Sequence, residues 1–319
     1  MLKLSVNLLL LFKICNLWHQ MGHYIVARIA EQKLNAEAPE VLKRVYDMLK
    51  PLEPFFPERG NSLLEPAIAA DLLSNQFNEF LMYYHFIDVP FAYKNDKAVD
   101  LKFNDPFAFN VTYAYESGIK IIKESINPPE KTENNIRYIK NGLIDSLMLR
   151  YLLHIVGDIH QPLHSTMLYS KYLYNGTIEK GDQAGNFIPI DDIFDLNLTN
   201  LHSLWDAVLG SYPQHTELPL NDAGINYIQK SVDSLLAEYP ESYYAEAVKN
   251  LKINDWVDES NKIATEFVYS DIDVFPAIRP QYIAEGRRIA KERIALAGYR
   301  LAHVLMDAFK LQNAEAQLF

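Results

Sequence analysis

Leu153-His-Ile-Val-Gly-Asp-Ile-His-Gln-Pro-Leu-His164 is the stretch that predicts both the core of the fold and a functional site. Most of its residues are apolar, which is typical of a buried helix. His154 and Asp158 are four residues apart, so on a helix both side chains point the same way and could bind one ion. Pro162 predicts the end of the helix near Gln161, which lets His164 approach from another direction.

This composition favours a metal site. Three imidazoles and a carboxylate are costly to bury without partners. Imidazole and carboxylate ligands without thiolates are typical of zinc at catalytic sites. Two or more zinc ions close together suit an in-line displacement at phosphorus, because they stabilise both the attacking and the leaving oxygen.

The same histidine–aspartate spacing occurs twice more, at His202 and Asp206 and at His303 and Asp307. In a chain with nine histidines such pairs arise by chance. Their ordinary interpretation is an ion pair on a helix surface, worth about 0.3–0.5 kcal/mol. We keep that interpretation for His303 and Asp307, which have no further candidate ligands around them.

The rest of the chain predicts an all-α fold, with minor short strands and long loops. Short strands are expected only at 83–89 and 187–190. No Gly/Ser linker, charge block or internal repeat divides the 319 residues, so we expect a single domain over residues 18–319. Helices are expected from apolar periodicity at 22–34, 36–49, 63–80, 106–125, 134–159, 200–210, 221–239, 251–269 and 280–311.

Charge and cysteine content exclude several classes of protein. A formal net charge of -11 argues against a basic groove for nucleic acid. It does not exclude nucleic acid as a substrate, because bound metal ions can supply the positive charge. Cys15 is the single cysteine, so neither an intramolecular disulfide nor a thiolate zinc site is available.

The N-terminus predicts a signal peptide over residues 1–17. Lys3 precedes an apolar run over residues 4–12 that is too short to span a bilayer. No later run has the length of a membrane helix. Sequons at Asn110, Asn175 and Asn197 agree with secretion. We expect a secreted protein, or one in the lumen of an acidic endomembrane compartment.

Several motifs together resemble those of the zinc-dependent single-strand nucleases and 3′-nucleotidases of the fungal P-one and S-one type, which have plant and protozoan relatives. They occur in the order of that family across nearly the whole chain after residue 17. Besides the central run, the motifs are Trp18-His-Gln-Met-Gly22-His23, Tyr84-His85-Phe86-Ile87-Asp88, Gly185-Asn186, His202-Ser-Leu-Trp-Asp206 and Leu296-Ala-Gly298-Tyr-Arg300-Leu-Ala302.

The resemblance implies three zinc ions. The first would be bound by Asp71, His85, His154 and Asp158. The second would be bound by His164, His202 and Asp206. The third would be bound by His23, Asp158 and the α-amino and carbonyl groups of Trp18, which requires cleavage just before that residue. Asp158 and Asp71 are therefore the expected catalytic carboxylates, and His160 is expected to orient a ligand or the turn.

The resemblance also implies substrate contacts: Phe86 would stack on a base, Asp88 would bind its polar edge, and Asn186 would contact the substrate. Two positions depart from the family. Ser74 stands where an arginine often lies, and Ala184 stands where a second glycine usually precedes the asparagine.

The function expected from these motifs is endonucleolytic hydrolysis of single-stranded DNA and RNA to 5′-phosphate products, together with 3′-nucleotidase activity, by a monomer. Two alternatives stay open. A zinc phospholipase C-like hydrolase shares most ligand positions, although that branch usually has glutamate in place of Asp206. Ser74 and the altered glycine segment would also fit an inactive secreted zinc-binding homologue.

Overall fold

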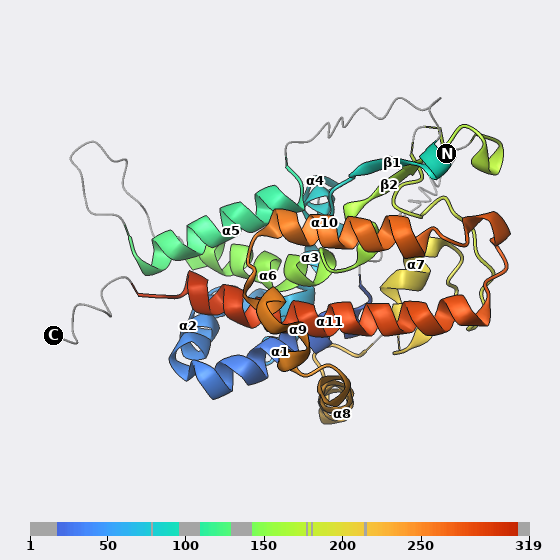
Figure 1. Cartoon of the computed structure of the whole chain (residues 1–319). Helices are drawn as coiled ribbons and strands as arrows, with labels where there is room; N and C mark the ends of the chain where they lie inside the picture. The colour runs from blue at the N-terminus through green and yellow to red at the C-terminus, as the bar shows by residue number, and fades with distance from the viewer. Residues whose placement is uncertain are drawn as a thin grey trace, which may run out of the picture.

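The structure is a computed structural model that describes residues 18–77, 79–95, 109–128, 142–176, 178–179, 181–213 and 216–311 (Figure 1). The predicted signal peptide lies outside the described residues. The helices of this part are α1 (Gln20–Glu37), α2 (Pro39–Leu49), α3 (Ala69–Phe77), α4 (Glu79–Met82), α5 (Val111–Ile126), α6 (Gly142–Asp158), α7 (Leu201–Asp206), α8 (Asp222–Glu238), α9 (Glu241–Tyr244), α10 (Ile253–Ile263) and α11 (Pro280–Ala308).

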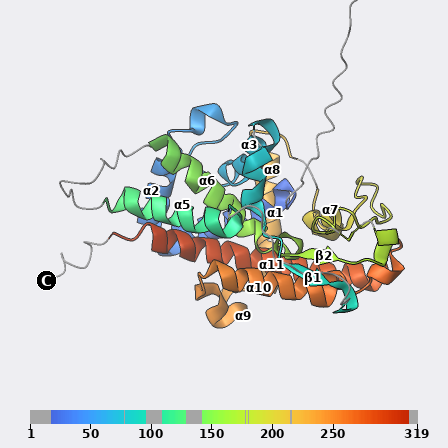
Figure 2. The ribbon, with the colours of Figure 1, turned by 90° about the horizontal axis from the view of Figure 1, so that it is seen from above.

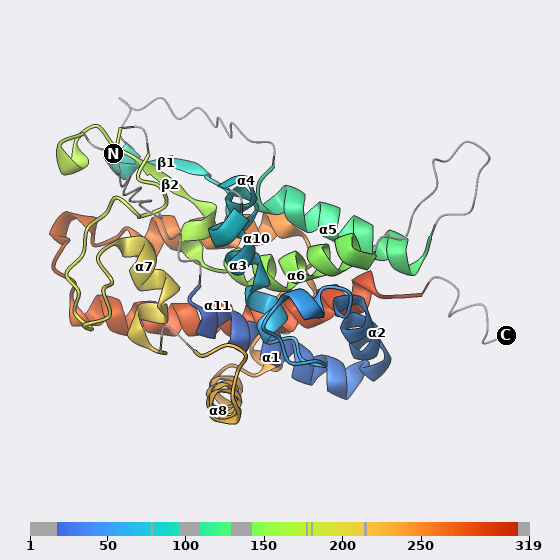
Figure 3. The same cartoon turned by 180° about the vertical axis from the view of Figure 1, so that it is seen from behind.

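Two helices far apart in sequence form one side of the core. The 29-residue α11 lies against α1 (Figure 3). The two backbones approach closely because Gly298 has no side chain at the crossing: a Cβ there would lie 2.6 Å from Cβ of Ile29. The N-terminal helix is thereby fixed to the C-terminal one, and its polar residues are held in a defined place.

Helix α6 runs through the core beside α5 (Figures 1 and 2). Leu149 and Leu153 lie on one side of it and Ile155 on another, and all three are fully buried. A helix that is apolar on all sides is stable only when other elements surround it. Its C-terminal end, which carries His154 and Asp158, is therefore shielded from solvent.

The prediction of a mainly helical single domain is confirmed, and the predicted strands are wrong. Two short parallel strands, β1 (Pro90–Ala92) and β2 (Met167–Tyr169), pair at the end of the molecule opposite α2 (Figure 2). Residues 83–85 instead form a short 3-10 helix, and 187–190 contribute one isolated bridge from Pro189 to Asn200. Aromatic and β-branched residues favoured strands there, but the tertiary contacts of these segments outweighed that preference.

The observed ends of two helices also differ from the predicted ones. The helix expected at 63–80 begins as a 3-10 turn, Glu65–Ile68, before α3. The helix expected at 200–210 ends at Asp206 and continues as a 3-10 turn. Across the part of the chain that the structure describes, none of the helices is both long and apolar enough to cross a membrane.

Candidate metal centre

The end of α6 supplies the centre of the site. Nε2 of His154 lies 3.2 Å from Oδ2 of Asp158, as the four-residue spacing predicts. The chain then turns into the 3-10 helix Pro162–Ser165, and this turn places His164 beside Asp158, with Nδ1 of His164 3.9 Å from Oδ1 of Asp158. The predicted change of direction after the helix is confirmed.

Four other segments bring polar side chains to the same place: α1, α3, the 3-10 helix Tyr83–His85, and α7. We call the eight buried or half-buried side chains that meet here the metal cluster: His23, Asp71, His85, His154, Asp158, His164, His202 and Asp206. Helices α1, α3 and α6, which carry four of them, meet near the middle of the molecule (Figure 3).

The metal cluster divides into three groups, each with its ligand atoms within 4.8 Å of one another. They are His23 with His154 and Asp158, Asp71 with His85 and His154, and His164 with His202 and Asp206. The third group has the composition that the resemblance implied. His154 belongs to both of the first two groups. Its ring stacks on that of His23, with 3.7 Å between the ring centroids.

Asp158 lies between the imidazoles of the first two groups. Its Oδ2 is 2.9 Å from Nδ1 of His85, and its Oδ1 is 3.4 Å from Nε2 of His23. A carboxylate has two oxygens that can each accept or ligate. The geometry therefore allows the bridging role that the resemblance implies for Asp158.

Backbone carbonyls orient three of the imidazoles. Nδ1 lies 2.6 Å from the Ala67 carbonyl in His154, 3.0 Å from the His85 carbonyl in His164, and 2.7 Å from the Ala184 carbonyl in His202. An Nδ1–H that donates to a carbonyl leaves Nε2 with a free lone pair, and this arrangement is common among metal-binding histidines.

Many inward-facing atoms of the metal cluster lack hydrogen bonds to described residues. Ring nitrogens of all five histidines, Oδ1 of Asp158 and Oδ2 of Asp206 are buried without a hydrogen-bond partner among the described residues. Buried polar atoms without a hydrogen-bond partner are rare in folded proteins. Burying a neutral polar group in this way costs up to several kcal/mol. Bound cations would satisfy all of them at once, so the donor set fits zinc.

The protonation tendencies agree with ligation. Burial lowers the pKa of His23, His85, His164 and His202, which favours the neutral imidazole that binds metals. Burial also raises the pKa of Asp206 to about 7. That carboxylate needs a nearby positive charge to stay ionised in this place.

His154 and Asp158 are the exception to this trend. Burial disfavours the charged form of both, but the charges of Asp158 and Asp71 outweigh it and raise the pKa of His154 well above its usual value. The charge of His154 in turn holds the pKa of Asp158 well below its usual value. A metal ion would replace the proton as the positive charge between them.

Trp18 lies beside the metal cluster. Its indole Nε1–H donates to the Gly157 carbonyl at 2.9 Å, one residue before Asp158. The next residue, His19, donates its backbone N–H to the Asp206 carbonyl at 2.9 Å. The start of the described chain is thus anchored to α6 and α7, and the ligand role of the Trp18 backbone stays a prediction.

The expected substrate residues flank the metal cluster. Phe86 and Asp88 are half-buried, and the backbone N–H of Ile87 between them donates to the His164 carbonyl at 2.9 Å. Asn186 is also half-buried and donates its Nδ2–H to the Gln183 carbonyl at 2.9 Å, within its own turn. Their roles remain predictions, and the side chain of Ser74 lies outside the described residues.

His160 belongs to a separate buried cluster. Its Nδ1 lies 2.7 Å from the Val156 carbonyl and its Nε2 lies 2.9 Å from Nη1 of Arg300. Arg300 in turn binds Glu259, as does Arg293. We call His160, Glu259, Arg293 and Arg300 the arginine cluster.

Gln161 is a polar contact of the metal cluster that the sequence analysis missed. It is fully buried, and its Nε2–H donates to Oδ1 of Asp206 at 2.8 Å. The sequence indicated Gln161 only as the end of a helix. Its position beside Pro162 in a run of ligands was the available signal, but nothing in the sequence linked it to a residue 45 positions away.

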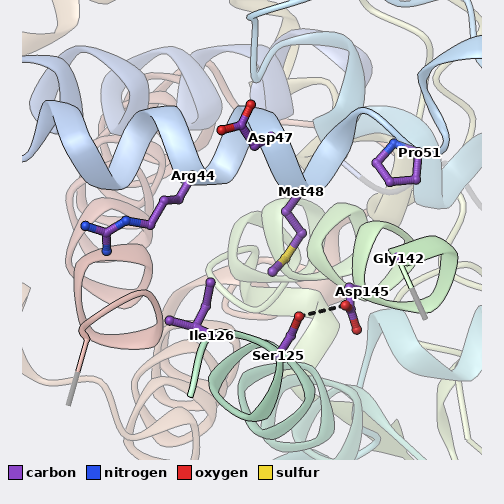
Figure 4. Close-up of a pocket in the computed structure, with 8 residues that line it drawn as sticks. All are labelled: Arg44, Asp47, Met48, Pro51, Ser125, Ile126, Gly142 and Asp145. Carbon is purple, nitrogen blue, oxygen red and sulfur yellow. Dashed lines mark hydrogen bonds between the residues drawn. The ribbon is translucent and has the colours of Figure 1, made fainter. Parts of the chain in front are cut away.

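A separate cavity of about 220 Å³ lies between α2, α5 and α6 (Figure 4). Its polar groups include Ser125 and Asp145, and Ser125 Oγ–H donates to Asp145 at 2.7 Å. Asp145 precedes His154 on α6 by nine residues, or about 14 Å along the helix axis. The cavity is therefore not part of the metal centre.

Comparisons with known proteins agree with this geometry. Residues 18–310 match the model of the S1/P1 nuclease family. The chain is 25% identical to nuclease S1 of Aspergillus oryzae over 322 positions, covering 95% of each chain. It is 22% identical to endonuclease 4 of Arabidopsis thaliana, covering 94% of this chain and 91% of that one. Endonuclease 3 of the same plant is 23% identical, with 98% and 97% covered.

Proposed function

Since the chain belongs to the S1/P1 nuclease family, we propose that it is a trinuclear-zinc phosphodiesterase. It hydrolyses single-stranded DNA and RNA endonucleolytically to 5′-phosphate products and also acts as a 3′-nucleotidase. The observation that carries the proposal is the set of buried, orphaned nitrogen and oxygen atoms of the metal cluster, whose residues converge from six helical elements of the chain.

The metal cluster would hold three ions, with the ligand sets that the resemblance implies. Asp71, His85, His154 and Asp158 would hold the first, and His164, His202 and Asp206 the second. His23, Asp158 and the backbone of Trp18 would hold the third. Zinc, when bound, supplies Lewis-acid charge that stabilises the phosphate oxygens during displacement.

The protein's own residues orient the reactants. Three backbone carbonyls fix the tautomers of His154, His164 and His202, so that each Nε2 faces the centre. Asp158 and Asp71 carry the negative charge that retains the ions. Because a net charge of -11 disfavours phosphate elsewhere on the surface, the metal centre is the place where a nucleic-acid backbone would bind.

Binding of a base would use the segment after His85. Phe86 would stack on the base and Asp88 would accept from its polar edge, with Asn186 contacting the substrate from the other loop. Stacking contributes about 1–3 kcal/mol per base and accepts any base. A base has to leave a duplex to stack in this way, which supports a single-stranded substrate.

We also propose that residues 1–17 are a signal peptide and that the protein is a monomer, secreted or held in an acidic endomembrane lumen. Glycans at Asn110, Asn175 and Asn197 would agree with that route. Removal of residues 1–17 would free the α-amino group of Trp18 for zinc.

The test combines metal analysis, N-terminal sequencing and activity on the purified natural product. We expect three zinc ions per chain, Trp18 as the first residue, and 5′-phosphate oligonucleotides from single-stranded DNA. Release of phosphocholine from lecithin without nuclease activity would select the phospholipase alternative. Full zinc occupancy without turnover of either substrate would select the inactive homologue.

A further inference from the structure

We propose that Gln161 is a positioning residue that holds Asp206 as a one-oxygen ligand and so keeps one coordination position open for substrate on the ion of His164, His202 and Asp206. The inference rests on the proposed function, because it concerns an ion of the catalytic centre. It goes further by giving a task to a residue outside the metal cluster.

The amide of Gln161 has only one possible orientation. Its Oε1 accepts the backbone N–H of Leu163 at 2.6 Å, and its Nε2–H donates to Oδ1 of Asp206 at 2.8 Å. A backbone N–H can only donate and an ionised carboxylate can only accept. The NH₂ group of Gln161 therefore faces Asp206, and the bond to Leu163 fixes it there.

This hydrogen bond makes the two oxygens of Asp206 unequal. Oδ1 is engaged by Gln161, whereas Oδ2 is buried without a hydrogen-bond partner in the described part of the chain and lies 3.3 Å from Nε2 of His202. Oδ2 is thus the oxygen of Asp206 that no hydrogen bond from a described residue competes for, while Oδ1 shares its lone pairs with the Gln161 amide. Catalytic zinc sites typically have three protein ligands and one open position, which a second carboxylate oxygen would occupy.

Asp158 provides the contrast within the same centre. Its Oδ1 faces His23 at 3.4 Å, and its Oδ2 faces His85 and His154 at 2.9 and 3.2 Å. Both oxygens of Asp158 are directed at other members of the metal cluster, as a bridging ligand requires. Asp206 differs because its Oδ1, which lies 3.7 Å from Nε2 of His164, also accepts the hydrogen bond from Gln161, whereas its Oδ2 faces His202 at 3.3 Å and has no hydrogen-bond partner among the described residues.

The test replaces Gln161 with methionine, which keeps the volume and removes the donor. In Gln161→Met we expect three zinc ions per chain, as in the wild type, and kcat/KM on single-stranded DNA lower by about 10- to 100-fold. A crystal structure of the zinc-loaded variant should show both oxygens of Asp206 on the ion. Ser260→Ala is the control, because it removes a buried hydroxyl that donates to the Ile159 carbonyl and accepts from Arg293 of the arginine cluster. It should lower Tm and leave kcat/KM unchanged.

Gln161→Glu is the second variant, for the case that Gln161→Met does not fold. A glutamate still accepts the Leu163 N–H but no longer donates to Asp206, and the same fall in kcat/KM is expected. An unchanged kcat/KM, or loss of the ion bound by His164, His202 and Asp206, would contradict the proposal that Gln161 keeps a coordination position open. If the wild-type protein contains no zinc or has no nuclease activity, the proposed function fails first; an active wild type with an unaltered variant contradicts only the inference about Gln161.

Discussion

The metal cluster and the arginine cluster lie next to each other, and both draw residues from the stretch 153–164. Both are buried and both contain histidine, yet their hydrogen bonding differs. In the arginine cluster, His160, Arg293 and Arg300 are each bonded to protein partners. In the metal cluster, ring nitrogens of all five histidines and one oxygen each of Asp158 and Asp206 have no hydrogen-bond partner among the described residues. Unmatched buried polar atoms, rather than histidine content, therefore indicate where an ion would bind.

His154 and His160 show the difference at a single atom. Both side chains are fully buried, and Nδ1 of each lies close to a backbone carbonyl. Nε2 of His160 accepts from Arg300, and burial together with the nearby arginine charges holds the pKa of His160 well below its usual value. Nε2 of His154 faces the carboxylates of Asp71 and Asp158 instead. A guanidinium occupies the position in one cluster that a metal ion would occupy in the other.

Removal of metal should therefore destabilise one cluster and leave the other intact. Each ion present at 1,000 times its Kd stabilises the folded protein by about 4 kcal/mol. We expect EDTA to abolish hydrolysis of single-stranded DNA and to lower Tm sharply, and added zinc to restore both. An unchanged Tm after complete removal of zinc, verified by elemental analysis, would contradict the assignment.

Substitution of the bridging carboxylate should have the next largest effect. Asp158→Asn removes a negative charge shared by two proposed ions, at a cost of about 4 kcal/mol in transition-state stabilisation, or about 1,000-fold in kcat/KM. Zinc content should fall with activity. Asp145→Asn is the matched control, because Asp145 is a buried aspartate on the same helix that accepts from Ser125 and is not a member of the metal cluster.

That control should retain both zinc and activity despite some loss of stability. If Asp158→Asn kept full zinc content and full activity, the bridging role would be wrong. If Asp145→Asn lost as much zinc as Asp158→Asn, the effect would belong to the helix rather than to the metal cluster.

The arginine cluster should respond in the opposite way, through stability alone. Glu259→Gln leaves Arg300 buried with its charge uncompensated. Breaking a buried ion pair costs about 3–5 kcal/mol, and partial exposure of Glu259 reduces this to about 2–3 kcal/mol. Urea unfolding would measure the loss, and zinc content should not change.

Glu285→Gln provides the comparison for a surface pair, because Glu285 and Arg288 are both largely exposed. Its cost should stay below about 0.5 kcal/mol. A drop in zinc stoichiometry in Glu259→Gln would show that the two clusters are coupled, and the distinction between them would then fail.

Much of the fold was predictable because burial follows apolar periodicity. The helices that carry His23, His154 and His202 were all expected, and only their ends differ. The strands were not predictable: β1 and β2 have three residues each, and their pairing depends on the turn after α6. The interpretation of His303 and Asp307 as an ion pair with each other was also wrong, because His303 binds Glu241 and Asp307 binds Lys123. Helical spacing brings residues onto one face but does not say what the next element offers them.

The side chains of the metal cluster could be predicted from the sequence. The backbone carbonyls and the Gln161 amide that orient these side chains could not. Spacing and resemblance together indicated the eight members of the metal cluster, and the structure brings them together. The carbonyls of Ala67 and Ala184 had no signal, because any residue supplies a carbonyl. Gln161 likewise acts through a contact that only the folded chain creates.

The smallest predicted effect concerns the backbone that supports the metal cluster. Ala184, whose carbonyl accepts from Nδ1 of His202, has φ = 55°, in the left-handed region. That conformation costs a non-glycine residue about 1–2 kcal/mol, which a glycine would avoid. Glycine also makes the unfolded chain more flexible, which offsets about 0.4–1 kcal/mol of this gain in stability. Ala184→Gly should therefore raise Tm by about 1–3 °C.

Ala30→Gly, in the interior of α1, is the control with the opposite sign, since glycine there should cost about 1 kcal/mol. Because Ala184→Gly keeps the carbonyl that orients His202, zinc content should stay at the wild-type value while stability rises. A lower Tm would mean that the methyl group of Ala184 packs more favourably than its backbone is strained. A change in zinc content without a change in Tm would mean that the conformation of residue 184 tunes His202 directly, and the loop would then count as part of the metal centre rather than as its support.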